Sequence, residues 1–158
     1  MLAWTACSTP SSPDPVAVPS PATAPTPSSV ASAIVDRTNT ERTRAGLAAL
    51  RADSRLTQAA QIHAEQMAAA GRMDHTLPDA RYPRLEDRLA AAAYRWQAIG
   101  ENVASGQRDA AQVVQDWMGS SGHRANILNT NFTEMGAGYS VDGNGQPYYV
   151  QVFARPAP

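Results

Sequence analysis

Apolar residues recur at helical spacing through the first half of the chain. The pattern predicts a helix that Ser32 caps and that runs to about Ala45, with Gly46 as its left-handed stop. A second helix is predicted to start near Asp53–Ser54 and to end before Gly71. The apolar stripe of this second helix consists of Leu56, Ala59, Ala60, His63, Met67 and Ala70.

Further along the chain, two stretches have helical character and one has the character of a strand. Residues 84–94 and 109–120 are predicted helices, and Asp109 is well placed to start the second of them. Between them, residues 98–106 alternate apolar and polar side chains and are flanked by glycines. This alternation predicts a short strand or an extended loop.

The end of the chain has the character of a β-hairpin. Residues 135–141 and 147–154 are rich in β-branched and aromatic side chains, and the sequence Asp-Gly-Asn-Gly at 142–145 separates them. Two Asx-Gly pairs between such runs favour a tight turn. Helices first and strands last indicate an α+β fold, in which helices cover a small antiparallel sheet. The expected core includes Leu56, Tyr94, Trp117, Ile127, Phe132 and Phe153.

Composition divides the chain into a tail and one domain. Residues 8–31 are rich in Pro, Ser, Thr and Ala and hold seven of the 12 prolines, which predicts a disordered, extended linker. The domain is therefore expected over residues 32–156, which is long enough for one packed core.

The N-terminal residues 1–7 read MLAWTAC, a small residue before a cysteine and then a polar tether. They resemble the end of a bacterial lipoprotein signal peptide, with Cys7 as the lipidated residue. This interpretation predicts export to the periplasm or the cell surface, with a lipid anchor at Cys7 or, without one, secretion. The alternative is an N-terminus without such a role.

Charge and cysteine content exclude several classes of partner and site. The formal net charge is −1 and the pI is about 6.3, so no basic field is available to hold nucleic acid. The single cysteine excludes an intrachain disulfide and any multi-cysteine metal site. No apolar run of bilayer-spanning length occurs, so the only membrane contact expected is a lipid at Cys7.

Few residues carry candidate chemistry. His63 lies on an apolar helix stripe and is expected to be a packed residue with one satisfied nitrogen, whereas His75 and His123 are expected in loops. Glu101 lies between Ile99 and Val103, and a carboxylate in such a setting needs a partner from elsewhere in the fold. His75, Glu101 and His123 could together hold Zn²⁺ or another divalent ion, form a metal-free hydrogen-bonded cluster, or act as a general acid–base pair.

Four segments together resemble a bacterial CAP-domain protein of the SCP-like family, which includes cysteine-rich secretory proteins, antigen 5 and pathogenesis-related 1. They are IGENVA at 99–104, WMGSSGHRANIL at 117–128, NFTEMGAGYS at 131–140 and YYVQVFAR at 148–155. The resemblance covers residues 33–155 and implies a three-layer α-β-α sandwich. It also implies a cleft lined in animal and plant members by two histidines and two glutamates.

The resemblance assigns individual residues to this cleft. His75 and Glu101 match the first histidine and the first glutamate, while Ser120 and Tyr148 occupy the positions of the second glutamate and the second histidine. His123 belongs to a motif typical of bacterial members and is expected to fill the cleft instead. The expected supporting residues are Asn102, Arg124 and Asn126.

Two classes of function are compatible with this resemblance. The first is an extracytoplasmic, non-catalytic module that binds a small ligand, a lipid or an envelope component in the cleft. The second is a metal-assisted or acid–base hydrolase that acts on peptide or cell-wall bonds. The disulfides on which eukaryotic members rely cannot form here, so core packing alone must stabilise the domain.

Overall fold

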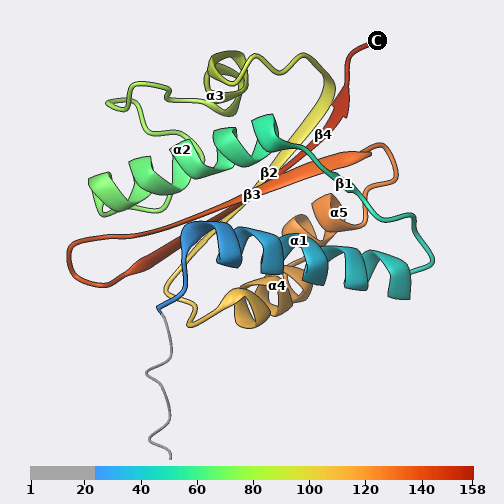
Figure 1. Ribbon diagram of the computed structural model, residues 1–158, viewed down its shortest axis with the longest axis horizontal. Coiled ribbons are helices and arrows are strands. Elements are labelled where there is room, and N and C mark those ends of the chain that lie inside the picture. The colour runs from blue at the N-terminus through green and yellow to red at the C-terminus, as the bar shows by residue number, and fades with distance from the viewer. Residues whose placement is uncertain (1–23) are drawn as a thin grey trace, which may run out of the picture.

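The computed structural model describes residues 24–158, in which helices cover both faces of one four-stranded sheet (Figure 1). The helices are α1 (Pro27–Arg44), α2 (Ser54–Ala70), α3 (Leu85–Ala91), α4 (Ala110–Gly119) and α5 (Ser121–Ile127). The strands are β1 (Arg51–Ala52), β2 (Trp96–Ser105), β3 (Glu134–Val141) and β4 (Pro147–Pro156). Helices α2 and α3 lie on one side of the sheet, and α1, α4 and α5 lie on the other (Figure 1).

The sheet has the strand order β1-β3-β4-β2. Strands β3 and β4 form the predicted hairpin, and β2 pairs antiparallel with the other side of β4. The short strand β1 pairs in parallel with the start of β3, so the sheet is antiparallel except at this edge. The α+β class and the three-layer α-β-α sandwich are confirmed.

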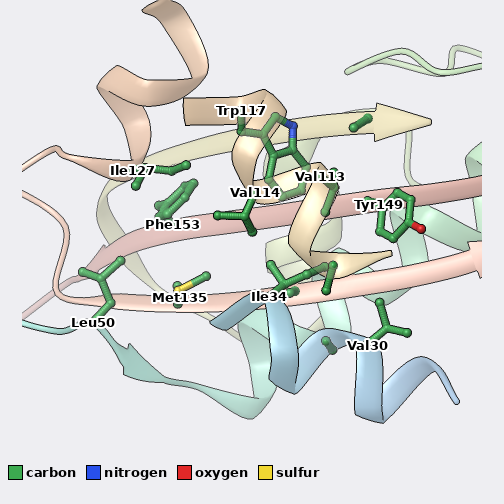
Figure 2. Close-up of a cluster of buried hydrophobic side chains, with 14 of the residues drawn as sticks. Val30, Ile34, Leu50, Val113, Val114, Trp117, Ile127, Met135, Tyr149 and Phe153 are labelled. Carbon is green, nitrogen blue, oxygen red and sulfur yellow. The ribbon is translucent and has the colours of Figure 1, made fainter. Parts of the chain in front are cut away.

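Each face of the sheet has its own hydrophobic core, because neighbouring side chains of a strand point to opposite faces. On β4, Tyr149 and Phe153 pack under α1, α4 and α5, whereas Val150 and Val152 pack under α2 and α3. Figure 2 shows the first of these cores, with Trp117 of α4 beside the strands. All six expected core residues are buried, namely Leu56, Tyr94, Trp117, Ile127, Phe132 and Phe153.

Helix α1 begins at Pro27, whereas the sequence predicts a later start, with Ser32 as the cap. Thr26 is the N-cap, and it forms a capping box with Ser29. Val30 is buried in the core beneath α1, which compensates the ordering of this turn. The last residues of the predicted linker are therefore helical.

Several other expectations about local structure are confirmed or corrected. Asp53 and Asp109 cap α2 and α4 as predicted, and Gly71 ends α2 in the left-handed conformation. Helix α3 is shorter than residues 84–94, and β2 is a full strand. Strand β1 and helix α5 were not predicted. Because His123 lies in α5, the prediction that it lies in a loop was wrong. None of the described helices combines the length and apolar character needed to cross a bilayer.

Two glycines of β3 allow α2 to approach the sheet closely. A Cβ atom on Gly136 would lie 2.1 Å from the backbone nitrogen of Thr57, and one on Gly138 would lie 2.4 Å from the backbone of Ala60. These neighbours are helix backbone atoms, which cannot move aside as a flexible side chain could. Only glycine at both positions therefore permits this packing, and the approach fixes the height of α2 above the sheet.

We expect Gly138→Ala to destabilise the domain by about 1–3 kcal/mol or more, because the added methyl group forces α2 away from β3. Urea unfolding followed by circular dichroism measures the change. Gly143→Ala is the matched control, since its methyl group meets nothing within 4 Å, and its effect should stay within about 0.5 kcal/mol. Equal stability of the two variants would contradict the close-approach explanation.

Candidate functional site

Glu101 lies in the middle of β2, opposite Val152 of β4, and its side chain is only 4% exposed. It points to the α2 and α3 side of the sheet, where three side chains from other elements surround it. We call Glu101 with His63, His75 and Arg88 the Glu101 cluster. A carboxylate buried this deeply requires a compensating charge and hydrogen bonds.

Arg88 of α3 supplies the compensating charge. Its guanidinium Nη2 donates to Glu101 Oε2 at 2.6 Å, and its side chain is fully buried. Its Nη1 lies 3.4 and 3.3 Å from the backbone carbonyls of Tyr82 and Pro83, so Arg88 also holds the segment before α3. The charge of Glu101 is thus neutralised inside the protein.

His75 bonds the other oxygen of Glu101. Its Nδ1 donates to Glu101 Oε1 at 3.0 Å, while 56% of its side chain stays exposed. The hydrogen bond and the negative charge of Glu101 raise the pKa of His75, although partial desolvation opposes them. His75 therefore presents a stabilised imidazolium to the solvent at weakly acidic pH.

His63 of α2 lies beneath His75 and is fully buried. Its Nε2 donates to the backbone carbonyl of Asp74 at 2.8 Å and lies 3.8 Å from Glu101 Oε1. Burial lowers the pKa of His63, so the neutral imidazole is favoured. The expectation of a packed histidine with one satisfied nitrogen is confirmed, and among the described residues its Nδ1 has no partner.

His123 lies in α5, on the other side of β2 from His75. Asn102, the residue after Glu101, donates from Nδ2 to the backbone carbonyl of His123 at 3.1 Å. Asn126 donates to the carbonyl of Glu101 at 3.2 Å and to Asn102 Oδ1 at 2.9 Å. Burial and the positive charge of His75 lower the pKa of His123, so the pKa values of His75 and His123 are shifted in opposite directions.

The remaining expected site residues lie farther away or make other contacts. Ser120 is the N-cap of α5, but its side chain makes no capping hydrogen bond. The exposed Arg124 makes no side-chain hydrogen bond to residues 24–158. Asn102 and Asn126 make the side-chain hydrogen bonds that link α5 to β2. Tyr148 is buried opposite Ser105, about 13 Å along β4 from the Glu101 position at roughly 3.3 Å per residue. It does not join the Glu101 cluster.

The arrangement does not fit a divalent ion held by His75, Glu101 and His123. Both carboxylate oxygens of Glu101 are already bonded, one by His75 and the other by the buried cation Arg88. Within residues 24–158, no three His, Cys, Asp or Glu side chains are grouped as a metal site. Binding of an ion by Glu101 would require the displacement of a buried guanidinium, which is costly.

Sequence reasoning missed Arg88, although the sequence contains a signal for it. Leu85, Arg88, Leu89 and Ala92 recur at helical spacing, which places the arginine on the buried face of its helix. A buried arginine demands an acidic partner, and Glu101 is the carboxylate in an apolar segment. The expected lipidation residue, Cys7, lies outside the residues that the structure describes.

Comparison with known proteins agrees with the fold and the motifs. The sequence model of the cysteine-rich secretory protein family (CAP) matches residues 35–153. YkwD of Bacillus subtilis is 38% identical over 111 residues, which cover 70% of this chain and 42% of YkwD. This chain therefore spans about two fifths of the length of that relative.

Solved structures give the same assignment. An extracellular protein with an SCP domain from Bacillus anthracis is 32% identical, with a TM-score of 0.73 over 82% of this chain and 41% of that chain. An outer surface protein of Borrelia burgdorferi shares the fold at 20% identity, with a TM-score of 0.71 over 78% of this chain and 90% of that chain. The chain belongs to the cysteine-rich secretory protein (CAP) family.

Proposed function

We propose that this domain is an extracytoplasmic, non-catalytic binding module whose site takes an anionic group of a cell-envelope ligand at His75. One observation carries the proposal. Glu101 is buried and bonded on both oxygens, and its negative charge is matched by Arg88. The bond to Glu101 fixes the exposed His75 through Nδ1, so that its other ring nitrogen, Nε2, donates to a ligand when the ring is protonated. Protonation also leaves the cluster with a net positive charge.

The same bonds argue against Glu101 as a general base. A base must be able to reach a water or a substrate proton, whereas this side chain is 4% exposed and occupied by Arg88 and His75. Ser120 and Ser121 likewise lack an oriented base, because no hydrogen bond joins either hydroxyl to a histidine among residues 24–158. Binding therefore suits the geometry better than nucleophilic catalysis does.

Export is part of this proposal. The solved relatives include an extracellular and an outer surface protein. The proline-rich sequence before Thr26 would hold the domain away from an envelope surface, with Cys7 as a proposed lipid anchor. The acidic groups of such a surface are carboxylates and phosphates, the groups that a donor such as His75 binds.

We expect Arg88→Met to destabilise the domain by about 3–5 kcal/mol, because it leaves Glu101 buried without a countercharge. Chemical unfolding at neutral pH measures the loss. The double variant Arg88→Met with Glu101→Leu should regain most of the lost free energy of unfolding, since it removes both charges. Additive losses in the double variant would contradict the pairing of these two side chains.

We expect His75 to titrate above, and His123 below, the ordinary histidine range in NMR titrations of the imidazole signals. Because folding raises the pKa of His75, its bond to Glu101 stabilises the domain below that range and loses this effect as the pH rises through the raised pKa. Glu101→Gln should move the His75 midpoint back toward the ordinary value. The interpretation is wrong if His75 titrates in the same way in both proteins.

Binding is tested by cosedimentation of the purified chain with phosphatidylglycerol vesicles and, separately, with peptidoglycan sacculi. We expect binding to at least one of them, weakened severalfold by His75→Ala and by raising the pH through the pKa of His75. Arg44→Ala is the control, since it removes an exposed positive charge from the end of α1. Binding to the vesicles would indicate that the ligand group is a lipid phosphate, and binding to the sacculi would indicate that it is a peptidoglycan carboxylate.

Two outcomes would overturn the binding module. One is an absence of binding in both arms, or binding that His75→Ala leaves unchanged. The other is release of soluble fragments from the sacculi. That release would support the alternative of an acid–base hydrolase, which the opposite pKa shifts of His75 and His123 favour.

A further inference from the structure

His75, which is exposed, and His123, which is half-buried, lie in two separate short segments. His75 lies in the irregular segment between α2 and α3, and His123 lies in the short helix α5. Short segments of this kind make few backbone bonds of their own and open locally at low cost. Contacts from the rest of the fold must therefore hold His75 beside Glu101 and keep His123 in its position on α5.

On the His123 side, a chain of buried amides runs through the sheet. Gln151 of β4 donates from Nε2 to Thr38 Oγ1 of α1 at 2.5 Å, and its Oε1 accepts from Asn102 Nδ2 at 3.0 Å. The same Asn102 nitrogen donates to the His123 carbonyl, and Asn126 closes the chain onto the main chain of Glu101. Thr38, Asn102 and Gln151 are each fully buried.

On the His75 side, the buried imidazole of His63 holds the main chain next to His75. His63 Nε2 donates to the carbonyl of Asp74, the residue immediately before His75. The same nitrogen lies 3.8 Å from Glu101 Oε1, the oxygen that His75 bonds. His63 thus links rigid helix α2 to the backbone that carries His75.

We propose that His63 and Asn102, the latter oriented by Gln151, are positioning residues. His63 holds the segment that carries His75 beside Glu101, and Asn102 holds the main chain of His123. The inference rests on the proposed function, because His75 is the residue proposed to take the anionic group. Buried hydrogen bonds to main-chain carbonyls suit this role, since they fix a segment without occupying the exposed ring. Neither His63 nor Asn102 needs to touch a ligand.

The experiment is site-resolved modification of histidines by diethyl pyrocarbonate, with rates read by peptide mass spectrometry on the full chain. We expect Asn102→Ala to raise the modification rate of His123 severalfold and to leave that of His75 unchanged. His63→Leu should change the rate of His75 and leave that of His123 unchanged. His63→Gln retains a donor for the Asp74 carbonyl and should restore the wild-type rate of His75.

Asn39→Ala is the matched control for a merely structural effect. The Asn39 amide also bonds main-chain groups across the fold, donating to the Leu50 carbonyl at 3.0 Å and accepting from the Leu50 nitrogen at 2.8 Å, away from the site. Asn39→Ala should lower the melting temperature and leave the modification rates of His75 and His123 unchanged. If Asn102→Ala fails to fold, Asn126→Ala removes the half-buried outer amide of the same chain and should also raise the rate of His123.

The positioning role is overturned if the Asn102 and His63 variants lower the melting temperature as Asn39→Ala does but leave both rates unchanged. It is also overturned if either variant changes both rates equally, because that indicates general loosening. The measurement uses a reagent and no envelope component. A failure of vesicle or sacculus binding therefore remains distinguishable from a failure of this inference.

Discussion

The charge of one buried carboxylate organises the functional half of this domain. Glu101 leaves water when β2 pairs with β4, and its side chain retains only 4% exposure. The free-energy cost of burying this carboxylate without a partner is large. The segment between α2 and β2 therefore has to provide hydrogen-bond donors and a positive charge. Arg88 does so from α3 and His75 from the preceding loop, and the same arginine contacts the carbonyls of Tyr82 and Pro83. The path of this segment follows from the need to neutralise Glu101.

A second constraint sets the position of the helix above that carboxylate. The missing side chains of Gly136 and Gly138 let the backbone of α2 lie directly on β3. His63 follows one turn after Ala60, the residue that Gly138 meets. The close approach therefore brings the imidazole of His63 down to Glu101 and to the Asp74 carbonyl. Packing far from the exposed surface thus fixes the geometry of the site.

The family accounts for the fold, whereas the site residues must account for the function. The resemblance to CAP-domain proteins implies two glutamates and two histidines, of which it predicts only His75 and Glu101 in this chain. Arg88 occupies the second oxygen of Glu101, so the local chemistry is that of a neutralised carboxylate with an exposed donor. The proposed binding of an anionic group at His75 rests on this arrangement.

Those helices and strands whose signals lie within a few neighbouring residues could be predicted from the sequence. The caps at Asp53 and Asp109, the stop at Gly71 and the Asx-Gly turn gave α2, α4 and the hairpin, because each signal acts within a few residues. All six core residues expected from the sequence are buried. The buried start of α1 was missed, since composition alone cannot show that Val30 packs against the core. The candidate site could be predicted only in part. The apolar setting of Glu101 indicated that its carboxylate needs a partner, and His75 is one such partner.

Three features of the site emerge only from the three-dimensional packing. Arg88 is the other partner of Glu101, His63 lies beside Glu101, and Tyr148 lies elsewhere on β4. The physical reason is that these meetings depend on strand register and on the height of α2 above the sheet. Both are properties of packing between distant segments, which no local pattern of residues encodes.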